Sequence, residues 1–253
     1  AGGVTDTDDP SSLFYNPAAM AFMPTARGAL TGSVIDVSAK FKDEGSTVSP
    51  LFGGSPLTGG DGGDGGTTGY VPCLYYVQPI VENVNFGLAV DAPFGLATDY
   101  DDGWKGRYHA LKSDLVMVNI NPNVAVQVIP GLLSIGAGVC AQYADAELTN
   151  AIDFGAVNYG SGMPLGPAVA PQTADGHAKL TGDDWAVGYN LGILCTVTED
   201  TRIGLSYRSK VDHKLTGKVK FDVPAVALPL TMGGMFTDSD ASAELTTPET
   251  LTL

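Results

Sequence analysis

Trp185-Ala186-Val187-Gly188-Tyr189-Asn190-Leu191-Gly192-Ile193-Leu194-Cys195-Thr196-Val197 is the stretch that decides the fold class. Its odd-numbered residues are large and mostly apolar, whereas most of its even-numbered residues are small or polar. Successive side chains of a β-strand point to opposite faces, so this alternation predicts a strand with one apolar face. The stretch is also longer than the roughly five or six residues of an ordinary strand.

The same period of two recurs along the chain, for example in 133–143, 203–207 and 84–90. No apolar run approaches the roughly 18 residues that a membrane-spanning helix needs, so any membrane span must be made of strands. The segments that we expect to be strands are 27–42, 69–80, 84–100, 112–129, 132–147, 183–198, 201–221 and the start of an eighth at 242–253.

Short and long connections alternate between these segments. Short turns are expected near Glu82-Asn83, Pro130-Gly131 and Glu199-Asp200, and long loops at 43–69, 100–111, 145–181 and 222–241. A soluble β-sandwich also alternates apolar and polar residues, but long strands with short turns at one end are typical of outer-membrane barrels. We therefore expect an all-β, antiparallel transmembrane β-barrel with its apolar face toward lipid.

Composition excludes several classes of function. Charged residues make up 16% of the chain, below the roughly 25% of soluble domains. A net charge of −15 argues against nucleic acid as a partner, because phosphates attract clustered Lys and Arg. The three cysteines lack metal-site spacing, and the acidic stretches 61–64 and 99–102 lack a calcium-loop pattern, so no metal or cofactor is expected.

We see no catalytic constellation either, since His109, His177 and His213 are scattered and no Gly-x-Ser-x-Gly motif occurs. The N-terminus lacks a basic and apolar leader, and 247–253 resembles the start of a strand. We therefore expect a piece of a longer mature protein that is not an enzyme.

Five short segments together resemble the FadL-type family of outer-membrane transporters for long-chain fatty acids and other hydrophobic compounds. They are Asn16-Pro17-Ala18, Phe94–Tyr100, Trp185–Leu194, Ser206–Ser209 and Thr247–Thr250. The resemblance implies a fourteen-stranded barrel with a small N-terminal hatch inside it. On that template, residues 1–26 are the C-terminal part of the hatch, and residues 27–253 are the first half of the barrel, with seven or eight strands.

The resemblance also implies a lateral route, in which a ligand leaves sideways through a kink in the third strand. The kink would comprise Pro93, Phe94, Gly95 and Leu96. Proline cannot donate a ladder hydrogen bond and glycine weakens a strand, so a break is expected here on physical grounds as well. An ordinary bulge or strand end remains an alternative.

Two long loops are unusually apolar, and in the family such loops form the groove that first captures the ligand. Packing of the two loops on each other is the alternative, and both can hold. The groove residues would be Met163, Leu165, Val169, Val226, Leu228, Leu230, Met232 and Phe236.

Polar candidates lie in the hatch and on the small-residue face. Asn16, Pro17 and Ala18 favour a turn, either purely structural or coupled to gating. Arg202 and Arg208 are expected in the lumen, paired with a ligand carboxylate or with a lumenal Asp or Glu. Asp145 stands where fatty-acid-transporting relatives have a basic residue, which leaves room for uncharged aromatic hydrocarbons.

The expected function is passive transport of a hydrophobic small molecule, a fatty acid or an aromatic hydrocarbon, across the bacterial outer membrane. The expected surroundings are outer-membrane lipid and lipopolysaccharide, and we expect a monomer. A general porin and a barrel lipase are the alternatives. A porin would need opposed rows of charge, yet the positions expected in the lumen are mostly Gly, Ala, Ser and Asn.

Overall fold

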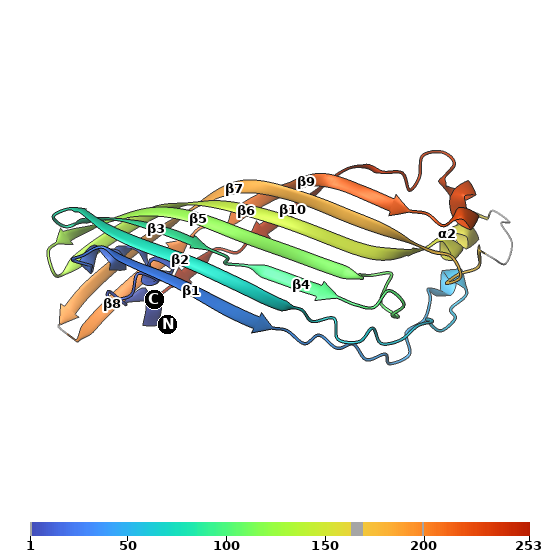
Figure 1. The fold of residues 1–253 in the computed structure, drawn as a ribbon, viewed down its shortest axis with the longest axis horizontal. Helices are drawn as coiled ribbons and strands as arrows, with labels where there is room; N and C mark the ends of the chain where they lie inside the picture. Colours follow the sequence, from blue (N-terminus) through green and yellow to red (C-terminus); the bar gives the residue numbers. More distant parts are fainter. Residues whose placement is uncertain (1, 163–168, 199) are drawn as a thin grey trace.

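The computed structural model describes residues 2–162, 169–198 and 200–253. They form one antiparallel sheet of eleven strands in the order β1-β2-β3-β5-β6-β7-β8-β11, which is not closed (Figure 1). The strands are β1 (Arg27–Asp36), β2 (Thr68–Val81), β3 (Val84–Asp91), β4 (Gly95–Asp99), β5 (Lys112–Ile129), β6 (Leu133–Asp153), β7 (Asp175–Thr198), β8 (Thr201–Arg208), β9 (Val211–Asp222), β10 (Ser239–Thr247) and β11 (Thr250–Thr252).

The eleven strands occupy eight positions in the described part of the wall. β3 and β4 both pair with β5, β8 and β9 both pair with β7, and β10 and β11 continue this pattern on β9 and β8. The antiparallel barrel wall predicted from the alternation is confirmed.

The expected single strand 201–221 is wrong in one respect, because it is broken at Ser209-Lys210. The Ser209 side chain accepts a hydrogen bond from the Tyr189 backbone N–H, so it takes the place of a ladder partner on β7. The break also changes which residues face inward. Even-numbered residues such as Ser206 are buried before it, and odd-numbered residues such as His213 are buried after it.

The expected loop 145–181 is too long, because β6 continues to Asp153 and β7 begins at Asp175. The two strands pair without a break from Leu133↔Cys195 to Asp153↔Asp175. In the halves of β6 and β7 that lie toward the long loops, which we call their upper halves, the outward side chains are polar, as at Thr149 and Lys179. A strand that has left the lipid needs no apolar face, so the alternation that identifies strands disappears there. The first strand is shorter than the expected range 27–42, because its pairing with β2 ends at Asp36.

Side-chain exposure follows the alternation in the membrane-level part of β7. Val187 and Leu191 are exposed, whereas Asn190 and Leu194 are buried. Val139 of β6, which pairs with Tyr189, is exposed as well. The apolar face of the sheet is therefore its outer face, and the Gly-rich and Asn-rich face lines the interior.

Residues 2–26, which we call the hatch segment, lie against the interior face near the end with the short turns (Figure 1). They contain η1 (Gly2–Val4), α1 (Ser12–Tyr15) and η2 (Pro17–Phe22). Leu13 and Met20 form a core with wall residues that include Val77, Ala89 and Ala125. The opposite end carries η3 (Pro50–Phe52), α2 (Phe154–Ser161) and η5 (Ala225–Thr231). None of the helices among the described residues has the length and hydropathy of a membrane span.

Candidate transport site

Asn16 joins the hatch segment to the barrel wall. Its Nδ2 donates to the carbonyl oxygens of Val4, at 2.9 Å, and of Ile193 in β7, at 3.1 Å. Its Oδ1 accepts from the Ala18 backbone N–H at 3.0 Å and so caps η2, where Pro17 takes the first helical position. Because Asn16 is fully buried, one side chain fixes both the fold of the hatch segment and its place on the wall.

The wall meets this turn with two glycines that permit close backbone approach. A Cβ on Gly192 would lie 2.0 Å from Asn16 Oδ1, and one on Gly136 would lie 2.5 Å from the Ala18 nitrogen. Any other residue at either position would push the hatch segment off the wall. This contact, the glycine socket (Gly136 and Gly192), accounts for two of the glycines on the interior face.

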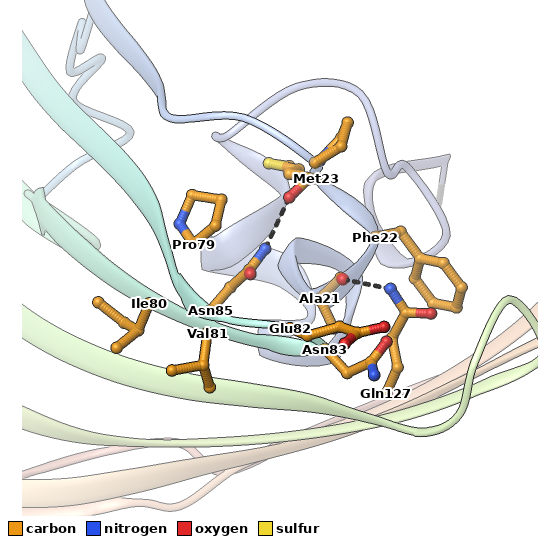
Figure 2. A pocket seen from close by; sticks show the side chains of 11 residues that line it. Ala21, Phe22, Met23, Pro79, Ile80, Val81, Glu82, Asn83, Asn85 and Gln127 are labelled. Atoms are coloured by element: carbon orange, nitrogen blue, oxygen red, sulfur yellow. Dashed lines mark hydrogen bonds between the residues drawn. The ribbon is translucent and has the colours of Figure 1, made fainter.

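Further side chains of the wall hold the C-terminal end of η2. Asn85 Nδ2 donates to the carbonyls of Met20 and Met23, and Gln127 Nε2 donates to that of Ala21 at 2.7 Å. Figure 2 shows the bonds to Met23 and Ala21 beside a cavity, of about 340 Å³, that lies between the hatch segment and the β2–β3 turn. The hatch is thus tied down by amide side chains, each of which satisfies carbonyls that a short helix leaves free.

Arg208 points at the hatch segment. Its Nη2 donates to the carbonyl of Phe14 at 2.8 Å, and the guanidinium carbon lies 4.6 Å from the centre of the Phe14 ring. Nη1 lies 3.7 Å from the sulfur of Cys140. Arg202, by contrast, is exposed next to the β7–β8 turn. Only one of the two expected lumenal arginines therefore meets the interior, where it contacts the Phe14 carbonyl, the Phe14 ring and the Cys140 sulfur.

A belt of polar side chains crosses the interior above the hatch segment. Asn121 Nδ2 donates to Asn190 Oδ1 at 3.0 Å, and Asn190 Nδ2 donates to Asn123 Oδ1 at 2.9 Å. His213 lies between Gln142 and Asp184, with ring nitrogen to oxygen distances of 2.9 and 3.2 Å. We call the set the polar belt; it comprises Asp91, Asn119, Asn121, Asn123, Gln142, Asp184, Asn190 and His213.

The interior above the polar belt is apolar. Met117 and Leu215 are buried there in one cluster with Ala144. Met117 is the next inward residue of β5 after Asn119, so the change from polar to apolar occurs within one step along the strand. We call this part the upper lumen; Leu115, Ala146 and Leu245 pack around its edge.

The wall is interrupted between β3 and β4. The last pair between β2 and β3 is Leu74↔Val90, and the described ladders contain no pair between β2 and β4. The two sides meet again where Thr67 Oγ1 donates to the Ala97 carbonyl at 3.2 Å and at the bridge Gly66↔Thr98. We call the unpaired stretch between Leu74↔Val90 and these contacts the window. Pro93 and Phe94 lie beside it, although Phe94 still accepts a bond from the Met117 N–H of β5.

A second proline borders the window, and the sequence reasoning missed it. Pro72 lies in β2 just beyond the last pair with β3, and its nitrogen has no proton to donate to a ladder. The signal was present in the sequence as a proline inside a strand-like run. Between the pairs Asp91↔Asn119 and Gly95↔Val116, three residues of the interrupted strand face only two of β5, so the break includes one extra residue.

The predicted apolar loop residues divide into two groups. Val169 and Leu230 are fully buried together with Phe154, and Phe236 packs against them. Val226, Leu228 and Met232 are exposed by 49, 53 and 77%. Met163 and Leu165 lie outside the described residues. The first group forms the core of a cap made by the two loops, so only the second group presents an apolar surface to solvent.

Arg107, which the sequence reasoning did not select, connects three extracellular loops. Its guanidinium contacts Asp175 at 2.7 Å, the carbonyl of Thr58 at 2.7 Å and the hydroxyl of Tyr108 at 2.7 Å. Nearby, Asp43 accepts from Lys105 and from Ser46, and these bonds hold the pKa of the Asp43 carboxyl well below its ordinary value. Loop 37–67 is therefore fastened across loop 100–111.

A β-sheet with an apolar outer face, a hatch on its inner face and an apolar upper lumen defines the class of outer-membrane β-barrels that contain a plug. The chain belongs to the family described as Outer membrane protein transport protein (OMPP1/FadL/TodX), whose model matches residues 1–253. Its location is the bacterial outer membrane, as the names of its relatives state.

Among curated relatives, the outer membrane protein P1 of Haemophilus influenzae is 28% identical over 89% of this chain and 53% of its own length. The long-chain fatty acid transport protein of Escherichia coli O6:H1 is 32% identical over 62% of this chain and 36% of its own. The chain spans about half the length of the first of these relatives.

Two solved structures resemble the fold. The Pseudomonas aeruginosa FadL homologue superimposes with a TM-score of 0.84 at 25% identity, over 98% of this chain and 61% of that one. The Pseudomonas putida toluene transporter TodX has a TM-score of 0.64 at 19% identity, over 95% and 60%. The similarity to TodX concerns the fold alone.

Proposed function

We propose that this chain forms the hatch, residues 1–26, and the first part of the barrel, residues 27–253, of a passive transporter for hydrophobic small molecules. The ligand is captured by the exposed apolar residues of the extracellular loops, enters the upper lumen and leaves sideways through the window into the membrane. Long-chain fatty acids and aromatic hydrocarbons are the two candidate ligand classes. The proposal assigns no enzymatic activity to the chain.

The window beside an apolar lumen is the observation that carries the proposal. Backbone groups without a ladder partner are tolerated at membrane depth only where they line a cavity or meet other protein. An apolar molecule that passes from the lumen to the bilayer never enters the aqueous periplasm. Its transfer is favoured by about 0.8 kcal/mol for each methylene group removed from water, so no energy source is required.

A general porin, the alternative function, would need an open aqueous channel. The hatch segment is held by Asn16, Asn85, Gln127 and Arg208, which supports a closed floor instead. The barrel lipase, the second alternative, would need a serine and a histidine in contact. The buried histidine, His213, contacts Gln142 and Asp184 instead.

The test closes the window from both sides without changing the loops, by deleting Pro93 and replacing Pro72 with Val in the same protein. Deletion of Pro93 leaves two residues to face the two of β5, which restores a continuous register from Asp91 to Gly95. The matched control combines Pro72→Val with Pro93→Ala, which keeps the extra residue. With the complete protein in outer membranes, we expect the combined variant to abolish uptake of radiolabelled oleate and toluene and the control to retain most of it. Full uptake by a correctly inserted combined variant would refute the lateral route.

A further inference from the structure

Three buried side-chain oxygen atoms at the inner rim of the window accept no hydrogen bond from the described part of the chain. Within the described residues, Asp91 Oδ2, Asn119 Oδ1 and Asn121 Oδ1 have no hydrogen-bond partner. Asp91 is 3% exposed, and the two asparagines are fully buried. A buried polar atom without a partner costs about 1–3 kcal/mol, so such atoms cluster where something is meant to bind or move.

The register of the strands places the three residues together. Asp91 pairs with Asn119, and Ala89 pairs with Asn121, so all three side chains stand on neighbouring positions of the inner face. We call them the acceptor triad. Asp91 follows Val90, the last residue of β3 that pairs with β2, so the triad lies at the lower edge of the window.

The free atoms are acceptors, and the orientation of the amides is determined by their other contacts. Asn121 Nδ2 donates to the Val139 carbonyl and to Asn190 Oδ1, and both of these atoms can only accept. Asn119 Nδ2 faces Asp91 Oδ1 at 3.5 Å. Rotating either amide would bring two acceptors together. The missing partner is therefore a hydrogen-bond donor.

The surrounding charges select a neutral donor. Asp91 brings a carboxylate to the triad, which opposes a carboxylate ligand. Arg208 reaches the same belt through Cys140, whose sulfur lies 3.8 Å from Asn190 Oδ1, and its guanidinium opposes an ammonium ligand. A hydroxyl group donates one hydrogen bond and carries no charge, so neither Asp91 nor Arg208 repels it.

On the basis of the transport function proposed above, we propose that the acceptor triad binds the hydroxyl group of an apolar alcohol or phenol while its hydrocarbon part occupies the upper lumen. The apolar cluster around Met117 begins one inward position above Asn119, so a molecule with one polar end fits both surfaces. The acceptor triad thus adds neutral, hydroxyl-bearing hydrocarbons to the ligand classes of the proposed transporter.

We expect a ligand at the triad to disturb the hatch helix α1, which lies on the same face of the wall. The three oxygens are shielded in this structure, and the hatch helix α1 packs on the same face of β3, where Leu13 contacts Gly87. The contact of Arg208 with the Phe14 carbonyl holds this helix in place. A hydroxyl group that reaches the triad therefore loosens α1, which provides a readout independent of transport.

The experiment compares 1-dodecanol, dodecane and dodecanoate, at pH 8, for binding to the complete protein in detergent. For each variant we take the affinity for dodecanol divided by the affinity for dodecane. The different solubilities of the two compounds cancel when this ratio is compared between variants. Asn119→Leu keeps the shape of the side chain and removes one acceptor, so we expect this ratio to fall about threefold to tenfold, the value of one hydrogen bond. Asn123→Leu is the matched control, because Asn123 Oδ1 already accepts from Asn190.

Two further measurements keep the test decisive. Asp91→Asn removes the negative charge, and we expect it to raise the affinity for dodecanoate relative to dodecanol even if Asn119→Leu does not fold. Hydrogen exchange of residues 12–15 should increase with dodecanol and not with dodecane. An unchanged affinity ratio in folded Asn119→Leu, or unchanged dodecanoate binding in Asp91→Asn, would overturn the proposal.

The outcome also separates this inference from the transport function. Equal binding of dodecane and dodecanol to the native protein would mean that the triad holds only water, which refutes the inference and leaves transport intact. If the native protein takes up neither of these compounds and neither oleate nor toluene, the transport function itself is refuted.

Discussion

Asn16 and Ile193 are 177 residues apart in the sequence, yet the side-chain amide of the first donates a hydrogen bond to the backbone carbonyl of the second. The bond fixes the hatch to β7, the longest strand of the described wall. Because Asn16 also binds Val4 and Ala18, the fold of the hatch and its attachment depend on the same side chain.

Replacement of Asn16 by Leu should release the hatch while the barrel stays folded. It leaves the Ala18 N–H and the Val4 carbonyl without partners, each at a cost of about 1–3 kcal/mol. Limited proteolysis should then cut within residues 2–26. Gly192→Ala should have the same effect, because its Cβ would collide with Asn16. Equal protease resistance of both variants and the native protein would contradict the role of the glycine socket.

The outer face of β6 and β7 should be in contact with lipid. Spin labels at Val139, Val187 and Leu191 are expected to be relaxed by oxygen dissolved in the bilayer and protected from a water-soluble nickel complex. A label at Asn190, on the opposite face, serves as the control and should show neither behaviour strongly. The alternation also places Tyr143 and Ile193 on the outer face, and labels there should behave like those at Val139, Val187 and Leu191. Strong nickel accessibility at most of these sites would reverse the assignment of the two faces.

Exposed and buried leucines of η5 should have different effects when they are changed. Leu228→Asp combined with Met232→Asp should weaken uptake at low ligand concentration, because it places charge on the exposed apolar loop surface, without loss of stability. Leu230→Ala should instead destabilise the loop cap by about 2–5 kcal/mol, since its side chain is fully buried. Melting curves and initial uptake rates distinguish the two. Normal uptake by the double variant would show that the exposed loop surface plays no part in ligand capture.

Loop 37–67 should remain fastened between pH 7 and pH 5. The pKa of Asp43 is lowered in the folded loop, so the charged carboxylate contributes stability above its ordinary pKa of about 3.9. That contribution is lost only as the pH falls below this value toward the lower folded pKa. Asp43→Asn should make the loop protease-sensitive at every pH. Loosening of the native loop at pH 5 to 6 would show that another group controls it.

The barrel and its faces could be predicted from the sequence because lipid enforces a strict alternation, as in 185–197. The upper parts of β6 and β7 could not, because Thr149 and Lys179 face water and no apolar pattern is required there. Pro93 identified the interruption of the wall, but its full extent also needed Pro72, whose position opposite the break depends on the register of β2.

The candidate site was less predictable for a different reason. Leu228 and Leu230 are identical in type and two positions apart, and only the folded cap decides that one is exposed and the other buried. Asp91, Asn119 and Asn121 carry no motif, and pairing between strands is what brings them together. Arg107 likewise joins loops that lie far apart in the chain.

The height of the wall determines where this protein meets its surroundings. β7 has 24 residues, and about 9–11 suffice to cross the lipid at the usual tilt. At about 3.3 Å for each remaining residue and a tilt of about 40°, the wall extends roughly 35 Å beyond the lipid. The loop cap is therefore held well away from the lipid, and strand length sets how far from the membrane this protein can first meet a ligand.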